Sequence, residues 1–366
     1  MGGFALITLP DGGRRMIERH SLLKKLPKSW SKKLVSRLRP GFTGTIREKD
    51  TMEELGYMMD VPGFSADWGS LSFFRREKQL KALIDRLRDA GIHILVFPYW
   101  NCYLEREEID YIEANELIVL DGYKIRTYTL IQVLDHFCRM LKSYLPSMKL
   151  GVWRADNDAG EIWAAILAKR FNEVTLGGME REELNRIADS LMYSTGLSCR
   201  MTDNMDECIA NKDMVIVTSD IEANKITRGS IVFNAHRLEF FRREKPLLVI
   251  DSGWTGIPHD IMVDRDLRPW EEIALLEGIF CCMSENYRKI AMMPEVTEDH
   301  LDHIQNLFKL YPLKIKGIVA GERDISFDAF RMSFLDPFIK RIKRNQGAWK
   351  DENEINFLDK PIRNTL

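Results

Sequence analysis

The sequence predicts an α/β protein with two domains, the second of them doubly wound. Two observations lead to this prediction. Short apolar runs that are typical of buried strands alternate with segments whose apolar residues recur every three or four positions, as on one face of a helix. In the second half, the connections between the first runs are long enough for the crossovers that parallel strands require.

Length and composition bound the function classes. The chain has 366 residues, of which 45% are apolar and 30% charged, and this length is ordinary for two domains of about 100–200 residues each. The 53 basic and 55 acidic side chains leave a net charge of −2, so there is no basic field for nonspecific binding of nucleic acid or anionic membranes. We therefore expect small-molecule or protein partners and no nucleic acid.

The cellular location is predicted from patterns that the sequence lacks. No apolar stretch approaches the ~20 residues of a membrane-spanning helix, and the N-terminus has no signal-peptide pattern. The cysteines form no CxxC pair and the histidines no metal-binding pattern. We expect a cytoplasmic protein with no membrane span, no metal site and mostly buried thiols. The cysteines are Cys102, Cys138, Cys199, Cys208, Cys281 and Cys282.

Residues 1–128 form the predicted N-terminal α/β substrate domain. Residues 70–90 are predicted to be a helix, because Leu80, Leu83 and Leu87 recur at helical spacing and Gly91 ends the pattern. Strands are expected at 4–7, 56–61, 92–97 and 117–120, and a second helix at 104–115.

A helix at 128–144, ended by Pro146, connects the domains, and we assign residues 129–146 to this connection. Residues 147–268 form the predicted Rossmann-like nucleotide domain. Its strands are expected at 150–153, 174–176, 214–218, 230–234 and 247–251, and its helices at 160–171 and 180–193. C-terminal helices are expected within 269–345, at 269–290, 300–311 and 327–344, packing across both domains, with a tail at 346–366.

The loop after the strand at 150–153 is where a Rossmann domain holds a pyrophosphate. It reads Arg154-Ala155-Asp156-Asn157-Asp158-Ala159-Gly160, so only the last glycine of a glycine-rich pattern is present. Two aspartates would repel a pyrophosphate, Arg154 would partly offset them, and Asn157 tolerates the left-handed conformation that a glycine supplies. An ordinary strand-to-helix turn capped by Asp158 fits the same residues.

The second strand of this domain leads into Gly177-Gly178-Met179 and lacks the acidic residue that binds a ribose 2′-hydroxyl. Because Arg181 is nearby, the sequence favours the 2′-phosphorylated cofactor, NADPH.

Cys282 and Glu285 are the second candidate site. They are three positions apart and so share a face of the predicted helix at 269–290. A nucleophilic cysteine must be a thiolate, and a neighbouring carboxylate raises the pKa of a thiol, so Glu285 is better suited to handling a proton than to activating Cys282. A buried core cysteine is the alternative interpretation.

Several segments follow one another in an order that indicates a family. They include Gly151-Val152, Val217-Thr218-Ser219, Val249-Ile250-Asp251-Ser252-Gly253 and Gly278-Ile279-Phe280-Cys281-Cys282-Met283-Ser284-Glu285. From Phe4 to Phe330 the chain resembles long-chain fatty acyl-(acyl-carrier-protein) reductases and the related shikimate dehydrogenase-like and glutamyl-tRNA reductase-like proteins. The last segment is similar to that family's phenylalanine-x-cysteine-x-(alanine or serine)-glutamate segment.

The resemblance implies an NADPH-dependent oxidoreductase that reduces an acyl thioester, linked to a carrier protein or to CoA, to an aldehyde through a cysteine acyl-enzyme. It implies acyl-carrier protein or acyl-CoA as the partner. The matching catalytic positions are Cys282 and Glu285, and the matching cofactor-binding positions are Arg154, Ala155, Asn157, Gly160 and Ser219.

The chain departs from the family at Arg154 and Asn157, which replace glycines, at Arg126, which replaces an asparagine, and at 234–237. The alternative is therefore a non-reducing relative with a lost dinucleotide site, acting as an accessory or carrier-protein-binding protein or as a cysteine acyltransferase in a biosynthetic pathway. The basic stretch from Arg14 to Arg39 is either a docking surface for an acidic carrier protein or a solvated helix face. The sequence indicates no oligomeric state.

Overall fold

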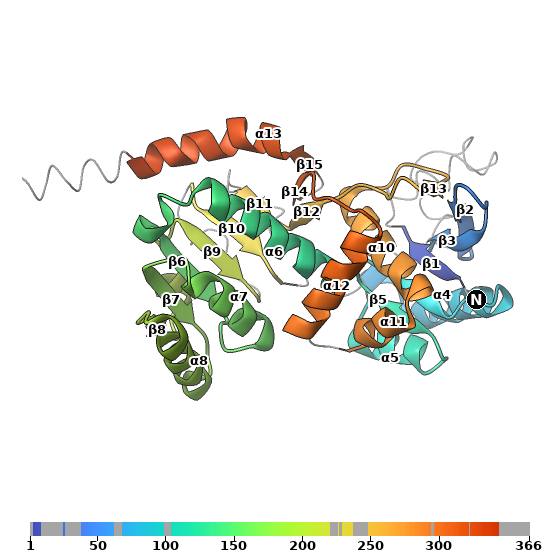
Figure 1. Ribbon diagram of the computed structural model, residues 1–366. Coiled ribbons are helices and arrows are strands. Elements are labelled where there is room, and N and C mark those ends of the chain that lie inside the picture. The colour runs from blue at the N-terminus through green and yellow to red at the C-terminus, as the bar shows by residue number, and fades with distance from the viewer. Residues whose placement is uncertain are drawn as a thin grey trace, which may run out of the picture.

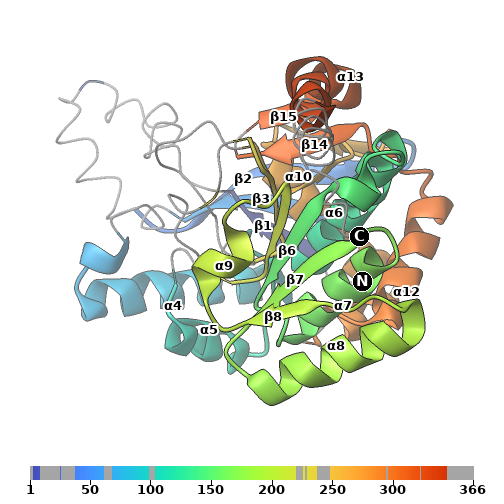
Figure 2. The same cartoon turned by 90° about the vertical axis from the view of Figure 1, so that its left-hand side faces the viewer.

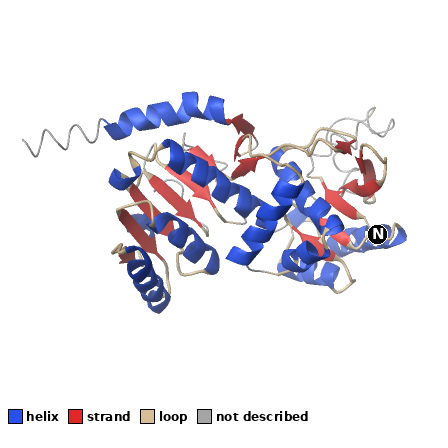
Figure 3. Ribbon diagram, in the orientation of Figure 1, coloured by secondary structure: helices blue, strands red, loops and turns tan. Residues whose placement is uncertain are grey.

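The computed structural model describes residues 3–8, 25, 38–61, 68–98, 104–219, 226, 229–236, 248–293, 296–321 and 323–343. Within these ranges the predicted α/β class is confirmed, because helices alternate with largely parallel strands in two lobes, each built around one six-stranded sheet (Figures 1 and 3). The basic stretch from Arg14 to Arg39 lies almost entirely outside the described residues, and the tail at 346–366 lies wholly outside them.

The first sheet has the strand order β13-β2-β3-β1-β4-β5. Its strands are β1 (Phe4–Ile7), β2 (Gly41–Glu48), β3 (Glu54–Asp60), β4 (Ile94–Val96), β5 (Ile118–Leu120) and β13 (Ile261–Val263). β1, β3, β4 and β5 are parallel, whereas β2 pairs antiparallel with β3, and β13 with β2. β13 thus belongs to the first sheet, although it falls within the 147–268 range that the sequence assigns to the nucleotide domain.

Helices cover both faces of the first sheet. α4 (Phe73–Asp89), α5 (Arg106–Glu113) and the short 3₁₀ helix Trp68–Ser70 lie on one face, where Leu83, Leu87 and Ile109 pack against Ile7 and Phe97. On the other face, α10 (Pro269–Met283) packs against β1, β3, β4 and β5. The central strands β1 and β4 are buried on both faces, which is why they are continuous apolar runs in the sequence.

The second sheet consists of β6 (Lys149–Trp153), β7 (Glu173–Gly177), β8 (Arg200–Thr202), β9 (Met214–Val217), β10 (Ile231–Asn234) and β11 (Leu248–Ile250). All its pairings are parallel, and the order is β11-β10-β9-β6-β7-β8. Numbered from β6 as the first strand, this is the 3-2-1-4-5-6 order of Rossmann sheets. The predicted doubly wound domain is therefore confirmed.

The helices of this lobe enclose the sheet. α7 (Asp158–Ala168), α8 (Arg181–Thr195) and α6 (Tyr123–Met140) contribute to one apolar cluster on the same face. α9 (Met205–Ile209) contributes Cys208 and Ile209 to a separate cluster with Val215 and Val217, and Figure 2 shows α9 on the opposite side of the sheet from α7.

α6 connects the two lobes and begins before the predicted start at residue 128. Gly122 adopts a left-handed conformation (φ 81°) at its N-terminus, and a Cβ there would lie 3.0 Å from the Cα of Ala274 in α10. The first turn of α6 is buried, and its charged residues Lys124 and Arg126 form polar contacts inside the protein. Because these two residues are charged, apolar periodicity did not indicate that the helix begins there. A 3₁₀ turn (Leu145–Ser147) follows α6.

The remaining elements bridge the lobes and return to the nucleotide domain. A small sheet joins β12 (Ser252–Trp254), β14 (Gly317–Ala320) and β15 (Arg323–Ser326) in the order β12-β14-β15. α11 (Glu285–Ala291) and α12 (Glu298–Leu310) pack with α10 on the first lobe. α13 (Phe327–Phe330) continues through a π-helical turn (Arg331–Leu335) into helical residues up to 343, which pack on the second lobe.

The predicted helix at 269–290 is interrupted at Ser284. This residue is extended (φ −133°, ψ 111°), so α10 ends at Met283 and α11 begins anew. The Ser284 hydroxyl accepts a hydrogen bond from the Tyr287 N–H at 3.1 Å, and such side-chain capping competes with continuation of a helix.

Candidate functional site

The strand order of the second sheet reverses between β6 and β9, and ligands of doubly wound sheets bind beyond the carboxyl ends of the strands at such a point. The loop after β6 and the residues after β9 are joined there by side chains. The Thr218 hydroxyl lies 3.0 Å from the main-chain oxygens of Trp153 and Arg154, and the Asn157 amide donates to the Thr218 oxygen at 3.2 Å. Ser219 follows at the same edge and is half-buried. The structure thus brings together the predicted cofactor residues of both loops.

Asn157 has a different role from the one expected. It is extended (φ −114°) and caps α7, with its side-chain oxygen accepting the Gly160 N–H at 2.8 Å. The left-handed residue in this loop is Arg154 (φ 58°). Asp158, the expected cap, is instead the first residue of the helix.

Gly160 holds the start of α7 against β6. A Cβ at this position would lie 2.2 Å from the main-chain oxygen of Arg154 and 2.6 Å from the Cα of Ala155. Ala155 is itself fully buried, and its N–H donates to Gly177 in β7 at 2.8 Å. Gly160 therefore meets the need of a Rossmann turn for close approach of helix and strand, which no larger residue satisfies.

The loop fits a pyrophosphate on the side of α7. The first two helical N–H groups, of Asp158 and Ala159, have no hydrogen-bond partner among the described residues, which is the arrangement that receives anions at a helix N-terminus. The Arg154 guanidinium, in the same loop, is partly exposed and pairs with Asp156. The exposed Asp158 carboxylate opposes the positive charge of this guanidinium.

Asp156, the other aspartate of the loop, is turned away from this opening. Its carboxylate accepts hydrogen bonds from Arg154 Nε at 2.8 Å and from the N–H groups of Met179 and Glu180 at 2.7 and 2.9 Å. Burial opposes its ionisation, but the hydrogen bonds from Glu180, Arg154 and Met179 outweigh burial and hold the pKa of Asp156 below its usual value. The expected repulsion by two aspartates is therefore reduced to that of Asp158.

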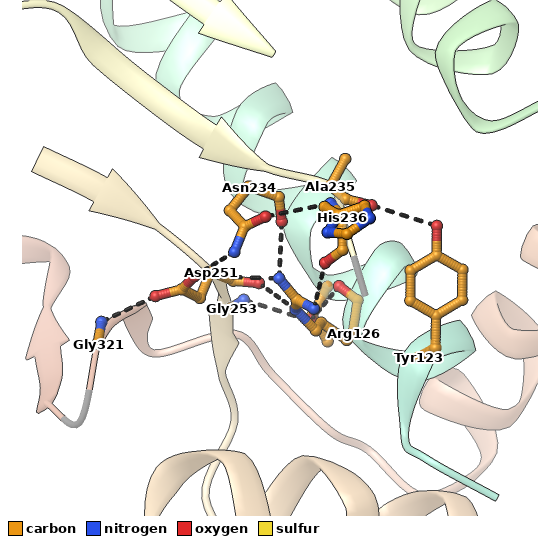
Figure 4. A network of polar contacts seen from close by, with 9 residues as sticks. Tyr123, Arg126, Asn234, Ala235, His236, Asp251, Gly253 and Gly321 are labelled. Carbon is orange, nitrogen blue, oxygen red and sulfur yellow. Dashed lines mark hydrogen bonds and ion pairs between the residues drawn. The ribbon is translucent and has the colours of Figure 1, made fainter. Parts of the chain in front are cut away.

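On the other half of the sheet, Arg126 of α6 reaches the carboxyl ends of β10 and β11 (Figure 4). Its guanidinium donates to the main-chain oxygens of Asp251 (2.8 Å), His236 (2.6 Å) and Asn234 (2.8 Å), and it lies 3.9 Å from the Asp251 carboxylate. The Asp251 carboxylate also accepts from the Asn234 amide at 2.7 Å and from the Gly321 N–H at 2.8 Å. In the sequence, Arg126 and residues 234–237 are recognised only as departures from the family pattern. No sequence pattern indicates that the Arg126 side chain contacts that segment.

A small pocket lies next to this network, where the first sheet meets α6 and α10. Its volume is about 20 Å³, the space of one water molecule. Tyr123, in its wall, donates its hydroxyl to the main-chain oxygen of Ala235 at 3.2 Å, so the pocket adjoins the carboxyl end of β10. The lining residues are Pro98, Asp121, Gly122, Tyr123, Arg126, Ser252, Trp270 and Ile273. The carboxyl ends of both sheets therefore face one region.

A buried carboxyl group supports the floor of this pocket. Glu277 of α10 is 2% exposed and accepts hydrogen bonds from the Gly122 N–H at 2.5 Å and from the Tyr287 hydroxyl at 3.3 Å. Burial raises the pKa of Glu277 above its ordinary value of 4.5, and the nearby Asp121 adds to the effect while Lys124 opposes it.

We expect the Glu277→Gln variant to lose part of the pH dependence of stability. Because the pKa of Glu277 is raised in the folded state, the native protein binds a proton that the unfolded chain releases above pH 4.5, so stability falls as the pH rises from there through the folded pKa. Thermal melts from pH 4 to 8 should show a flatter profile for Glu277→Gln. The exposed Glu285→Gln variant is the control and should follow the wild type; a parallel shift of both profiles contradicts the assignment.

The structure does not bring Cys282 and Glu285 together. Cys282 is half-buried near the end of α10, with its Sγ 3.9 Å from the main-chain oxygen of Leu55, and burial raises the pKa of its thiol to about 11. Glu285 is exposed on α11 and pairs with Lys289 at 3.1 Å. The break at Ser284 removes the shared helical face on which their pairing was predicted.

Two further expectations concern metals and membranes. Within the described ranges, no group of three or more histidine, cysteine or acidic residues is placed to hold a metal ion. None of the helices that the structure describes is long and apolar enough to span a bilayer.

Comparisons with family models and with curated proteins found no match. Among solved structures, the chain is similar to L-tryptophan dehydrogenase from Nostoc punctiforme, with 11% identity over 94% of this chain and 90% of that chain and a TM-score of 0.35. It is also similar to anabolic ornithine carbamoyltransferase from Campylobacter jejuni, with 12% identity over 68% of this chain and 77% of that chain and a TM-score of 0.27. A third similar structure is Δ1-pyrroline-2-carboxylate reductase from Thermococcus litoralis, with 11% identity over 31% of this chain and 35% of that chain and a TM-score of 0.22. TM-scores this low carry no argument, so the fold rests on the topology described above.

Proposed function

We propose that this protein is an oxidoreductase that uses a nicotinamide dinucleotide. The observation that carries the proposal is the 3-2-1-4-5-6 parallel sheet whose point of strand reversal holds a strand-to-helix turn closed by Gly160. The pocket at the carboxyl edge of the first sheet supports it, because this pocket adjoins the end of β10.

The residues of the first loop would hold the pyrophosphate. The N–H groups of Asp158 and Ala159 and the Arg154 guanidinium supply donors, and Gly160 lets the backbone approach closely. Thr218 fixes the two loops to each other, while the Arg126 network fixes the ends of β10 and β11. The bound cofactor supplies or accepts the hydride, and the protein supplies its position.

The small pocket fits the reacting oxygen of a carbonyl or alcohol substrate. Its volume of about 20 Å³ matches one oxygen-sized group. The Asp121 carboxylate and the Tyr123 hydroxyl are the pocket groups that can hold a proton there, and Trp270 and Ile273 supply apolar walls that exclude water. Asp121 is held in place by accepting the Tyr123 N–H at 2.9 Å.

Calorimetric titration of the purified protein with NADH and with NADPH tests the proposal. Saturable binding of either cofactor at a one-to-one ratio is the expected result. No heat with either cofactor, confirmed by unchanged thermal melts in their presence, contradicts the proposal and favours the non-reducing alternative.

Reduction of an acyl thioester through Cys282 is the narrower hypothesis, and the resemblance alone supports it. Along α10, Cys282 is 12 residues from Trp270 in the pocket wall, which is about 18 Å at the rise of an α-helix. Its neighbour Leu55 lies at the amino end of β3, the edge of the sheet opposite to the pocket. The described arrangement therefore places the thiol far from the small pocket to which we assign the reacting oxygen.

We expect the Cys282→Ala variant to bind dinucleotide as the wild type does and to retain cofactor-dependent reduction. Loss of aldehyde formation from an acyl-CoA, with cofactor binding unchanged, contradicts this expectation and restores the acyl-enzyme. Cys199→Ala is the matched control, because burial also raises the pKa of that thiol to about 11 and it lies in the other lobe.

A further inference from the structure

The side chain of Asp156 occupies a position between the first loop and the start of α8. It is wholly buried, and it belongs to the loop after β6, the first strand in the Rossmann order. One carboxylate oxygen accepts the N–H groups of Met179 and Glu180, and the other accepts Arg154 Nε. All three donors are therefore committed to an internal carboxylate.

The chain after β7 is shaped to admit this carboxylate. Gly178 follows the strand directly, and a Cβ at this position would lie 2.5 Å from the Asp156 Cγ and 2.6 Å from its Oδ1. Glu180, whose N–H the carboxylate binds, is the N-cap of α8, and its own side chain forms no capping hydrogen bond. Asp156 therefore binds the turn that leads into α8 and joins it to the first loop.

The Asp156 carboxylate lies at a position that has a known function in Rossmann sheets. The end of the second strand, here β7, lies where the ribose of the adenosine is bound, and a 2′-phosphate takes its donors from the residues that follow. Helix N-terminal N–H groups are typical donors to such an anion. Here the N–H groups of Met179 and Glu180, in the turn just before the helical residues of α8, already bind Asp156.

We propose, resting on the proposed function, that Asp156 makes this protein selective for NAD(H) over NADP(H). The carboxylate uses two N–H donors of the turn after β7 and places a like charge near the site of a 2′-phosphate. The negative charge near the end of β7 thus comes from the first loop and not from a residue that follows β7. Arg181, on which the expectation of NADPH rested, is exposed in the first turn of α8 beside Glu182 and Glu183.

Isothermal titration calorimetry of the full chain with NADH and with NADPH tests this specificity. The wild type is expected to bind NADH about tenfold more tightly or better, given the like charge and the missing donors. Asp156→Asn and Asp156→Ser remove the charge, and the side-chain oxygen of asparagine can still accept hydrogen bonds from the turn before α8. In each variant, the ratio of the two affinities is expected to shift toward NADPH by about fivefold or more. The control variant Arg181→Ala should keep the wild-type ratio.

The measured affinities for NADH and NADPH distinguish the cofactor specificity from the proposed function. Equal or tighter binding of NADPH by the wild type overturns the specificity and leaves the proposed function in place. An unchanged ratio in a folded Asp156 variant, as judged by circular dichroism, also overturns it, and the wild-type ratio decides if both variants fail to fold. Binding of neither cofactor overturns the specificity together with the proposed function.

Discussion

The Arg126→Ala variant is expected to lose about 3–5 kcal/mol of unfolding free energy, because removing one partner leaves a buried charge uncompensated. Arg126 is 7% exposed, and its guanidinium serves three main-chain oxygens and the Asp251 carboxylate. Alanine would leave those carbonyl groups without their charged donor and would separate α6 from the ends of β10 and β11. The midpoint of thermal unfolding should fall on the order of 10 °C.

Two further variants make this measurement specific. Arg126→Lys keeps the charge but not the planar fork that reaches several acceptors, so an intermediate loss is expected. Arg106→Ala is the control, because Arg106 is 64% exposed in an ion pair with Asp110, and its loss should cost about 0.5 kcal/mol or less. Similar melting of Arg126→Ala and Arg106→Ala would show that the buried network is not structural.

The Gly160→Ala variant is expected to lose both stability and dinucleotide binding. The added methyl group would lie 2.2 Å from the Arg154 oxygen and 2.6 Å from the Ala155 Cα, and neither main-chain atom can yield as a flexible side chain would. Forcing α7 away from β6 costs about 1–3 kcal/mol or more by overpacking. The same shift would move the N–H groups of Asp158 and Ala159, which would bind the pyrophosphate.

Denaturant unfolding and calorimetric titration with NADH measure the two effects separately. Gly41→Ala is the matched control, because a Cβ at Gly41 meets no atom within 4 Å. We expect Gly41→Ala to bind NADH as the wild type does. Wild-type affinity in Gly160→Ala would mean that the turn at α7 does not hold the cofactor.

The sequence predicted five of the six strands of the second sheet to within about two residues, because these five are buried and form apolar runs of the length of a strand. It missed β8, which is mostly exposed at the edge of that sheet. It missed β2, which is mostly half-buried and has no regular apolar alternation. It also missed β12, whose residues are Ser252, Gly253 and Trp254 and whose pairing with β14 depends on contacts remote in sequence. Such strands are defined by their partners.

The residues of the candidate site could be predicted only where a single short segment of the sequence contains the pattern that identifies them. Gly160 was recognised because a strand-to-helix turn with a close approach is local. The roles of Asp156 and Arg126 were not, because their acceptors and donors come from residues 24 and more than 100 positions away. The shared helical face of Cys282 and Glu285 was predicted from helical spacing, and such spacing does not indicate the break that the structure has at Ser284.

The path of the chain between the lobes has a consequence for how the protein is made. Phe330, Leu335 and Phe338 come from the last described helical stretch, yet they share an apolar cluster with Phe137 of α6. β13 and α10 likewise complete the first lobe after the second sheet has been synthesised. Neither lobe is a continuous stretch of sequence, so no single cut yields two complete halves. The residues up to Ile342 must leave the ribosome before the nucleotide lobe has the full core described here.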